Sequence, residues 1–324
     1  MATTSPLLSL DDVRRARARI GDRLHRTPLL SSRTLSERIG ADVLFKAELF
    51  QRTGSFKPRG VLNKLATLSE EEKRRGVISI SAGNHAQALA YASAVEGIDA
   101  LVVMWETASP MKIEAARGYG ATIDIQAPDI PAAFVRLDEL IEETGRTLVH
   151  PYDDPVVMAG QGTVGLEIME DVPETDVVLV QVGGGGLVSG IATAVKGVNP
   201  EARVVAVEPE KSPALHASLE AGEPVTVAAE SIADGLNGPY AGANCVRVCT
   251  ELGVESVLVS EDALCDAFRF MYARMKLACE VAGAATAAAL LSGAVEVEPG
   301  QKVAAVVSGG NVAPETAVAI LARR

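Results

Sequence analysis

Cysteine is scarce in this sequence, and its few thiols do not follow a metal-binding pattern. Four cysteines stand late in the 324-residue chain, and no two of them form a Cys-x-x-Cys pair. Structural zinc sites and redox-active dithiols commonly use that spacing, so the sequence predicts no metal site and no redox pair. Cysteine outside such patterns is usually a buried apolar residue, and we expect this of Cys245, Cys249, Cys265 and Cys279.

Excess positive charge is also missing. The chain has 30 Lys and Arg against 42 Asp and Glu, which gives a net charge of -12 and an isoelectric point near 4.9. A protein that binds nucleic acid needs a basic surface, so we expect no nucleic-acid partner. The most densely charged run, residues 69–75, mixes both signs and is typical of a solvated helix end.

No apolar run is long enough for a membrane span. The most apolar late stretch, residues 281–295, contains Gly, Thr and Ser and is shorter than the ~20 residues that a span needs, so it predicts a buried helix. Three leucines between residues 7 and 10 give way to two aspartates, where a signal peptide would stay apolar. Ser9 and Asp12 predict a capping box that opens an amphipathic helix through Ile20. We expect a cytoplasmic protein with no membrane partner.

Strand-like and helix-like segments alternate from about Val43 to the end of the chain. This alternation predicts an α/β fold with two open, mainly parallel twisted sheets and helices on both faces. A small domain at residues 51–149 would be inserted in a large one formed by residues 1–50 and 150–324. The predicted strands are residues 77–80, 101–104, 122–125, 147–149, 177–182, 203–207, 256–259 and 303–307.

Three glycine-containing motifs follow predicted strands and precede predicted helices. Parallel sheets bind ligands beyond the carboxyl ends of their strands, and all three motifs occupy that place. They are Ser81-Ala82-Gly83-Asn84-His85, Gly183-Gly184-Gly185-Gly186 and Ser308-Gly309-Gly310-Asn311.

The tetraglycine, residues 183–186, is the strongest signal for an anion. Without Cβ atoms, several backbone N–H groups can point into one concavity at the start of the helix from Leu187. The motif matches neither G-x-G-x-x-G nor a P-loop. A dinucleotide site stays open as an alternative because the next strand ends at Glu208, near the spacing of a ribose-binding acid. A tight turn is the structural alternative.

Lys57 supplies an amine for the same site. Gly54, Ser55 and Phe56 precede it, and Pro58 follows at a position suited to the first turn of a helix. A partly desolvated lysine beside an aromatic ring can have a lowered pKa and react with an aldehyde. An amine, a phosphate-binding loop and a lone hydroxyl at Ser308 together suggest pyridoxal phosphate, held covalently on Lys57.

The motif at residues 81–85 has two interpretations. Its backbone N–H groups suit a carboxylate, and the Asn84 amide suits an oxygen on a ring. Alternatively, Ser81 or Asn84 simply caps the following helix, and Ser308 could be a cap in the same way. We expect His85 to be a hydrogen-bonded structural histidine rather than a base.

Together the motifs resemble the threonine/serine dehydratase group of the fold type II pyridoxal phosphate enzymes, which are tryptophan synthase β-like. The resemblance covers nearly the whole chain in order. The matching strings are His25-Arg26-Thr27-Pro28-Leu29, Gly54-Ser55-Phe56-Lys57, Ser81-Ala82-Gly83-Asn84-His85-Ala86-Gln87, Ala159-Gly160-Gln161-Gly162-Thr163, Gly183-Gly184-Gly185-Gly186, Ala233-Asp234-Gly235 and Ser308-Gly309-Gly310-Asn311.

The resemblance implies a role for each motif. Lys57 would carry the cofactor and later serve as the base at Cα. Asn84 would bond the cofactor's ring oxygen, and Ser308 would meet its ring nitrogen. Residues 81–85 would grip the substrate carboxylate. The implied cofactor-binding residues are Phe56, Lys57, Asn84, Gly183, Gly184, Gly185, Gly186, Leu187 and Ser308, and the implied carboxylate-binding residues are Ser81, Ala82, Gly83, Asn84 and His85.

By the same resemblance, the protein would be an ammonia-lyase of amino-acid catabolism. It would convert L-threonine to 2-oxobutanoate and ammonia, and serine to pyruvate, and it would form a homo-oligomer, expected to be a dimer. The chain ends soon after Asn311, which resembles the short type without a C-terminal regulatory domain.

Alternatives within the family are a serine racemase or a dehydratase for another β-hydroxy amino acid. Racemases of this group place a second serine where this chain has Ala82, and a methyl group cannot exchange a proton, so elimination is expected. A nicotinamide-dependent oxidoreductase and a catalytically silent relative are the remote alternatives.

Two departures from the family pattern bear on the site. Trp105 stands where relatives usually have proline. Glu208 matches the acid that binds a divalent cation in some relatives, but Ala214 replaces the aspartate that assists it, so no metal site is expected.

Overall fold

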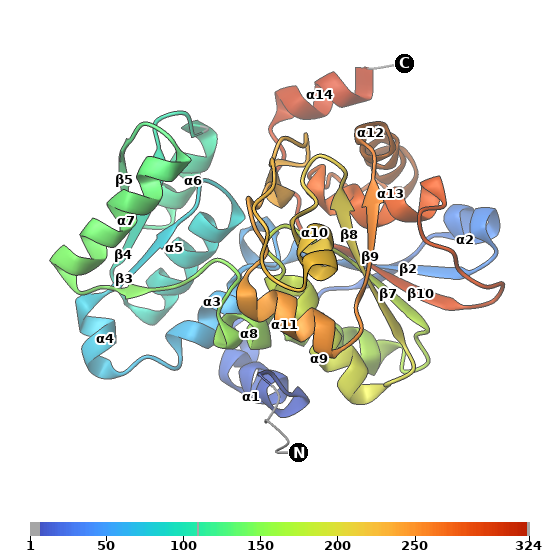
Figure 1. The fold of residues 1–324 in the computed structure, drawn as a ribbon, viewed down its shortest axis with the longest axis horizontal. Helices are drawn as coiled ribbons and strands as arrows, with labels where there is room; N and C mark the ends of the chain where they lie inside the picture. The colour runs from blue at the N-terminus through green and yellow to red at the C-terminus, as the bar shows by residue number, and fades with distance from the viewer. Residues whose placement is uncertain (1–6, 109, 323–324) are drawn as a thin grey trace.

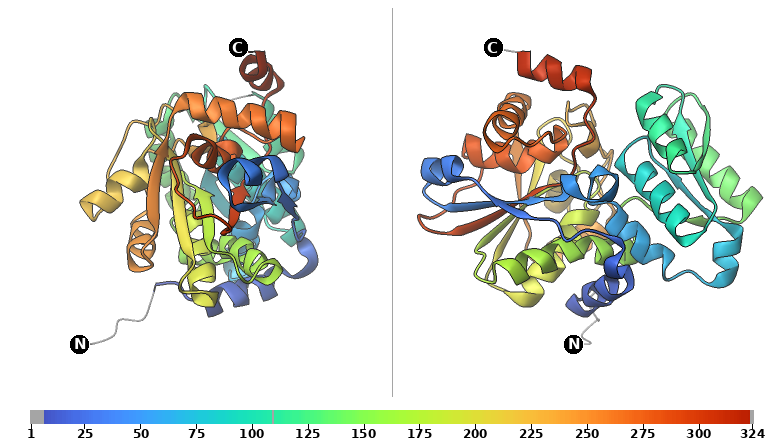
Figure 2. Two further views of the ribbon diagram at one scale, coloured as in Figure 1. Left: turned by 90° about the vertical axis from the view of Figure 1, so that its right-hand side faces the viewer. Right: turned by 180° about the vertical axis from the view of Figure 1, so that it is seen from behind.

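Two β-sheets form the framework of the protein in a computed structural model that describes residues 7–108 and 110–322. Figure 1 shows a smaller sheet on one side of the molecule and a larger sheet on the other, each between helices. Figure 2 gives the same arrangement from the side and from behind. The predicted α/β fold with two mainly parallel sheets is confirmed.

The larger sheet has six strands in the order β1-β2-β10-β7-β8-β9. Neighbours run parallel except for edge strand β1, which is antiparallel to β2. Its central strands are buried runs of Val, Leu and Ala, as a parallel sheet covered on both faces requires. The strands are β1 (Leu29–Ser31), β2 (Asp42–Ala47), β7 (Val177–Gln181), β8 (Arg203–Pro209), β9 (Glu255–Val259) and β10 (Lys302–Val307).

The smaller sheet has four parallel strands in the order β5-β4-β3-β6. All eight predicted strands are present as β3 to β10, with bounds that differ by two residues at most. Strands β1 and β2 were not among the eight predicted strands, although the expected strand–helix alternation begins near Val43, inside β2. The strands of this sheet are β3 (Val77–Ile80), β4 (Ala100–Trp105), β5 (Thr122–Ala127) and β6 (Thr147–Leu148).

Helices connect the parallel strands and cover both sheets (Figure 1). Around the smaller sheet lie α3 (Pro58–Leu65), α4 (Glu70–Arg75), α5 (Asn84–Glu96), α6 (Pro110–Gly118) and α7 (Ile130–Thr144). The remaining α-helices are α1 (Leu10–Ile20), α2 (Arg33–Ile39), α8 (Pro155–Asp171), α9 (Gly186–Val198), α10 (Ala214–Ala221), α11 (Ala243–Glu251), α12 (Glu261–Phe270), α13 (Ala285–Ser292) and α14 (Pro314–Ala322).

Short helical turns complete the chain. The 3₁₀ turns are η1 (Gly21–Arg23), η2 (Glu48–Phe50), η3 (Arg52–Gly54), η4 (Asp234–Leu236) and η6 (Ala282–Ala284), and η5 (Met271–Met275) is a π-helix.

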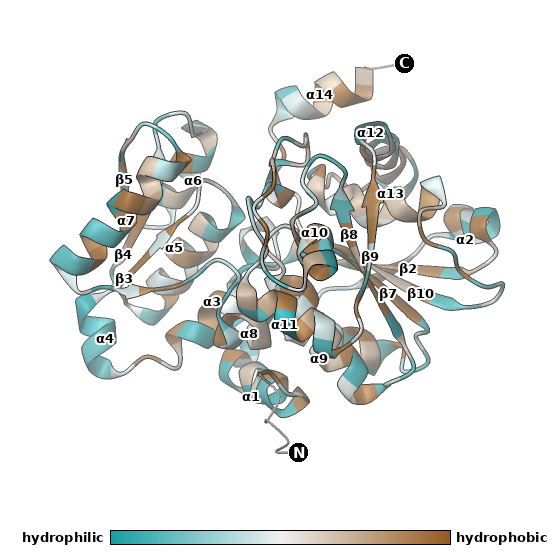
Figure 3. Cartoon of the chain, viewed as in Figure 1, coloured by the Kyte–Doolittle hydropathy of each residue, from teal (hydrophilic) through white to brown (hydrophobic). Residues whose placement is uncertain are grey.

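Local expectations about the helices hold. Ser9 and Asp12 form the predicted capping box at the start of α1, and the helix ends at Ile20. Most of α13, within the apolar stretch 281–295, is buried. The charged helix α4 has no buried residue and is drawn mostly in teal in Figure 3, as a solvated helix should be. No helix among the described residues combines the length and the apolar character needed to cross a membrane.

Alternation along the strands divides the core between the two faces of each sheet. In β7, Val177 and Leu179 pack with α12 and α13, whereas Val178 and Val180 pack with α8 and α9. In the smaller sheet one face packs against α3 and α5 and the other against α7. The four cysteines are buried and free, as expected.

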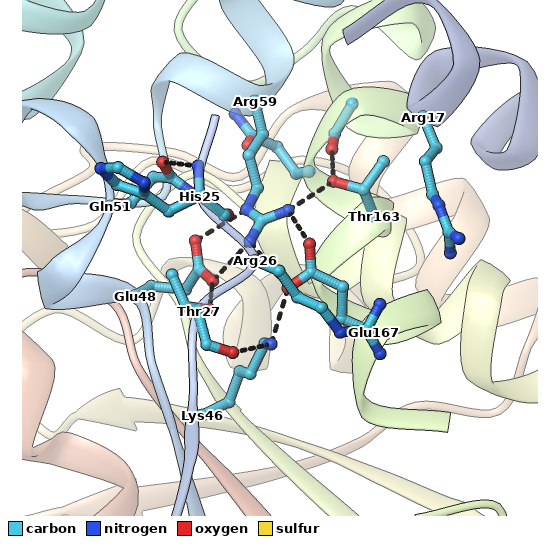
Figure 4. A network of polar contacts seen from close by, with 12 residues as sticks. Arg17, His25, Arg26, Thr27, Lys46, Glu48, Gln51, Arg59, Thr163 and Glu167 are labelled. Atoms are coloured by element: carbon cyan, nitrogen blue, oxygen red, sulfur yellow. Dashed lines mark hydrogen bonds and ion pairs between the residues drawn. The ribbon is translucent and has the colours of Figure 1, made fainter. Parts of the chain in front are cut away.

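A buried network of charged groups joins helix α3 to the larger sheet and to α8 (Figure 4). The Arg59 guanidinium donates to both oxygens of Glu48, at 2.8 Å each, and to both oxygens of Glu167, at 2.6 and 3.0 Å. Lys46 on β2 donates to Glu167 at 2.6 Å and to the Thr27 carbonyl oxygen at 2.6 Å. Two cations therefore face two carboxylates, and the buried charges balance.

Removing one member of this network should destabilise the protein strongly, because the other charges remain buried. We expect Arg59→Met to lower the free energy of unfolding by about 3–5 kcal/mol, measured by urea denaturation. The control is Glu37→Gln, because its pair with Arg33 is exposed and should contribute less than about 1 kcal/mol. An Arg59→Met protein as stable as the wild type would contradict this interpretation.

The same network predicts a pH dependence. Burial alone would raise the pKa of the Glu167 carboxyl, but Arg59 and Lys46 hold it below its usual value. A carboxyl whose pKa is lower in the folded state stabilises the fold above the unfolded pKa of ~4.3 and loses that contribution as the pH falls through the folded value. The stability difference between the wild type and Glu167→Gln should therefore narrow below about pH 4, as urea titrations at several pH values would show.

Candidate active site

A cavity of about 960 Å³ lies between the two sheets, and it is lined by residues 81–85, by residues 183–186 and, from the third predicted motif, by Ser308. It is bounded by the carboxyl ends of strands from both sheets, where parallel sheets commonly bind ligands. Lys57 lines the same cavity. The structure thus brings together segments that are far apart in the sequence.

Lys57 stands immediately before helix α3, with Pro58 in the first turn as expected. Its Nζ donates to the Pro151 carbonyl oxygen at 2.8 Å and lies 5.2 Å from the centre of the Phe56 ring. Burial lowers the pKa of this amine to about 8, and nearby Cys245 and Glu280 oppose the shift only in part. An appreciable fraction of the amine is therefore uncharged, and nucleophilic, near neutral pH.

The loop before Lys57 is tied to the end of β10. Ser55 forms a β-bridge with Gly309, and the Phe56 N–H donates to the Ser308 carbonyl oxygen at 3.0 Å. Gly54 has a φ of +70°, and a Cβ there would lie 2.7 Å from Asn311 Oδ1. Glycine is therefore needed at position 54 for both its conformation and the close approach.

The tetraglycine loop follows β7 and leads into α9, which starts at Gly186, one residue earlier than expected. No side chain caps α9, so the first N–H groups of the helix have no partner within it. A Cβ on Gly184 would lie 2.4 Å from the ring of Tyr152, and one on Gly185 would lie 2.7 Å from Cys245. The close packing of these neighbours thus requires glycine at positions 184 and 185. Close approach of an anion to the backbone would require glycine as well.

The side-chain amide of Asn84 is fixed from two sides. Its Nδ2 donates to Glu280 Oε1 at 2.8 Å, and its Oδ1 accepts from Asn311 Nδ2 at 2.8 Å. Asn311 also donates to the Thr53 carbonyl oxygen at 2.8 Å, which orients it in turn. One N–H of Asn84 remains for a further partner.

Glu280 was not predicted as a site residue, although it lines the cavity. Burial and the nearby Asp234 raise the pKa of its carboxyl to about 7, against the hydrogen bond from Asn84. Asn311 was in a predicted motif but without a role. No local pattern marks either residue, because both act through Asn84, which is distant in the sequence.

Residues 81–85 line the cavity beside Lys57. Ser81 Oγ accepts from the Gly83 N–H at 3.1 Å, and α5 begins at Asn84 without a side-chain cap. The cap alternative for Ser81 and Asn84 is therefore not what the structure shows. The His85 ring is buried, with Nε2 3.0 Å from both Ser79 Oγ and the Val149 carbonyl oxygen. Burial and Lys57 lower the pKa of His85 to about 3, so the ring is neutral.

Glu208 was the basis for considering a dinucleotide site and a metal site, and in the structure it has a structural role. The two oxygens of its carboxyl group accept from the backbone N–H groups of Leu215 and His216 at 2.8 and 2.7 Å, which caps the start of α10. Burial raises the pKa of this carboxyl to about 8 despite those bonds. Within the described residues, no cluster of three His, Cys, Asp or Glu side chains could hold a metal ion.

Sequence comparison identifies the family. The family described as pyridoxal-phosphate dependent enzyme matches residues 20–309. This chain belongs to that family. Pyridoxal 5'-phosphate is accordingly the cofactor, as the motifs around Lys57 predicted.

Relatives of this pyridoxal-phosphate enzyme match it over most of their length. The L-threonine ammonia-lyase of Thermotoga maritima is 42% identical over 307 residues, which covers 94% of this chain and 76% of that protein. The catabolic L-threonine dehydratase of Escherichia coli K12 is 40% identical over 307 residues, covering 94% of this chain and 93% of that protein.

Solved structures of similar proteins include both dehydratases and racemases. Maize serine racemase superposes with a TM-score of 0.92 at 37% identity, covering 96% of this chain and 95% of that one. The threonine deaminase of T.th. gives a TM-score of 0.89 at 41% identity, covering 94% of this chain and 99% of that one. Fold similarity alone therefore does not separate elimination from racemisation.

The cavity of this pyridoxal-phosphate enzyme fits its cofactor. Both polar atoms of the buried Gln181 amide and Nε2 of Gln161 have no hydrogen-bond partner within the described chain, and both side chains line the cavity. Buried polar groups in native proteins almost always have a partner, so a polar ligand or water is required there. Gln181 was not predicted from the sequence.

The two hydrogen bonds that orient the Asn84 side-chain amide should increase the affinity of the protein for its cofactor. We expect Asn311→Ala and Glu280→Ala each to weaken binding of pyridoxal phosphate to the apoprotein by about fivefold, the effect of one net hydrogen bond. In an Asn84→Ala background, both effects should shrink because they act through that residue. Fluorescence titration with the cofactor gives the affinities. Asn63→Ala is the control, since Asn63 is buried but bonds Val156 and Arg19 instead. If either effect on cofactor affinity were fully additive with that of Asn84→Ala, the inference that Asn311 and Glu280 act through Asn84 would be contradicted.

Proposed function

We propose that the protein is a threonine dehydratase that also acts on serine, with Lys57 as the catalytic base. The observation that carries this proposal is the buried Lys57 amine, whose pKa is about 8, in one cavity with the tetraglycine loop and residues 81–85. The names of the relatives at 40–42% identity support threonine as the substrate. The overall reaction converts L-threonine to 2-oxobutanoate and ammonia, and water lost in the elimination is regained in the final hydrolysis.

Each segment has one task in this proposal. The backbone N–H groups of residues 183–187 hold the cofactor phosphate at the start of α9. Asn84 donates its remaining N–H to the ring oxygen, Ser308 meets the ring nitrogen, and Phe56 lies beside the amine. When bound, the cofactor supplies a conjugated, electron-withdrawing ring that stabilises negative charge at the substrate Cα.

The chain's own groups then handle the substrate. The N–H groups at the start of α5, with Ser81 to His85, bind the substrate carboxylate, which a helix N-terminus favours. Lys57, uncharged in part because of burial, removes the proton from Cα. A hydroxyl rather than a carboxylate at Ser308 leaves the ring nitrogen without a strong negative partner, which favours rapid loss of the β-hydroxyl over a long-lived carbanion.

The assembly and motion of the protein are further parts of the proposal. Residues 51–149 form a small domain that closes over the substrate, against a large domain of residues 1–50 and 150–324. The protein works in the cytoplasm as a homo-oligomer, as a dimer in the simplest case. Light scattering that gives the mass of a monomer would contradict the oligomer.

Covalent capture of the cofactor tests Lys57 directly. Borohydride reduction of the holoenzyme should fix the cofactor to a peptide that contains Lys57, and label on Lys64 instead would reject the assignment. Because only the uncharged amine reacts, the rate of capture by the apoprotein should rise about tenfold per pH unit below pH 8 and level off above it. Lys57→Ala should keep some cofactor through the glycine loop and lose turnover.

Elimination and racemisation differ at Ala82, which lines the cavity. Racemisation needs an acid on the far face of Cα, and a positioned acid contributes ~10²–10⁴-fold. With L-threonine or L-serine, oxo acid should accumulate while the unreacted substrate stays in the L form, as chiral chromatography would show. Ala82→Ser should raise the yield of D-serine. Rapid formation of D-serine by the unmodified protein would favour a racemase, the function of its maize structural neighbour.

A further inference from the structure

One side of the cavity is apolar. The polar side carries Lys57, the glycine loop and residues 81–85, which the proposed function uses. A neighbouring part of the lining comes from the carboxyl end of the smaller sheet and from the start of α7. We call its apolar side chains the apolar wall, which consists of Trp105, Ile130, Pro131, Phe134, Leu137 and Leu148; the only charged side chain of α7 that lines the cavity within the described residues is Asp138.

The apolar wall lies beside the predicted carboxylate site because of the strand order. Strand β3 ends just before Ser81 and has β4 on one side and β6 on the other. The Ser81 N–H donates to the Val103 carbonyl oxygen of β4 at 3.2 Å, and β4 ends at Trp105. On the other side, Leu148 of β6 pairs with Ile78 of β3. Trp105 thus lies two residues beyond the β4 residue that Ser81 contacts, Leu148 pairs three residues before Ser81, and both side chains line the same cavity as residues 81–85.

Packing holds the two aromatic members of the wall in place. Trp105 and Phe134 are partly buried, and both pack against a cluster of buried residues that includes Val103 and Leu137. Both side chains also line the cavity. The apolar wall is therefore formed without a ligand.

The wall offers no spare positive charge. Lys57 and Lys112 are the only Lys or Arg among the described residues that line the cavity. The Lys112 ammonium of α6 is already paired with the Asp234 carboxylate of η4. A substrate with a second carboxylate would need a cation to compensate its desolvation, so the wall disfavours an anionic β-substituent.

We propose that, besides threonine and serine, the enzyme acts on L-β-hydroxy-α-amino acids whose β-substituent is apolar and larger than the methyl group of threonine, up to an aromatic ring, and that the apolar wall gives these substrates the higher kcat/KM. This inference rests on the proposed function. The β-substituent lies against the apolar wall, where burial of apolar surface is favourable in proportion to its area. For L-threo-3-phenylserine, the products are phenylpyruvate and ammonia, with the lost water regained as for threonine.

Steady-state kinetics of the holoenzyme test the preference. We expect kcat/KM for L-threo-3-phenylserine to exceed that for L-threonine by about tenfold, the low end of what an apolar pocket discriminates. Equal or lower kcat/KM for phenylserine would overturn the proposal. L-threo-3-hydroxyaspartate should be the poorest of the three, and efficient turnover of it would also overturn the proposal.

A binding measurement separates failure of this inference from failure of the proposed function. L-Phenylalanine and L-alanine lack the β-hydroxyl and cannot eliminate water, so titration of the cofactor absorbance gives their affinities even if no substrate is turned over. Tighter binding of L-phenylalanine by about tenfold supports the apolar wall. Equal or weaker binding contradicts it.

Substitutions in the apolar wall test whether its side chains cause the substrate preference. Phe134→Ala should lower kcat/KM for phenylserine about tenfold and change that for threonine much less. Phe134→Arg supplies a cation and should improve hydroxyaspartate turnover. Val135→Ala on the same helix is the matched control, because Val135 is 60% exposed and does not line the cavity. Equal losses for phenylserine and threonine in Phe134→Ala would show a structural role only and would overturn the assignment.

Discussion

The reactive lysine depends on a buried charge network that contains no catalytic group. Arg59 lies two residues after Lys57 and holds the first turn of α3 against Glu48 and Glu167. A guanidinium binds carboxylates in a fixed, bidentate geometry, so these bonds restrict the rotation and translation of the helix. The position of the Lys57 amine in the cavity follows from this anchor. A buried pair is a weak source of stability, but it specifies geometry well.

A second constraint couples the segments around the amine. The loop at residues 308–311 contacts the loop before Lys57 through backbone hydrogen bonds and contacts Asn84 through Asn311. Glu280 completes the arrangement by accepting from Asn84. Segments from both sheets thus meet at one small loop. A shift of the smaller sheet would change the Asn84 contacts, which links substrate closure to cofactor binding in the proposed function.

The cavity combines opposite physical characters in a short distance. Around Lys57 it offers backbone N–H groups and a partly uncharged amine, as a charged cofactor and an amino-acid backbone require. On the smaller sheet it offers aromatic and aliphatic side chains and, within the described part of the chain, no unpaired cation. The first part suits the chemistry of the whole family. In our proposal, the preference among substrates depends on side chains of the second part, such as Trp105 and Phe134.

The sequence by itself determined the eight strands β3 to β10, the α/β class and the motifs around Lys57, because short apolar runs, glycine loops and caps are local patterns. It also pointed to the cofactor. Sheet order and long-range partners were decided only by the tertiary structure. Asn84 meets Glu280 and Asn311 across 196 and 227 residues, and no local pattern encodes such pairs. Gln181 lies on a strand and Trp105 at the end of one, and no local pattern marks either as a site residue. Only the packing of the two sheets brings both side chains to one cavity.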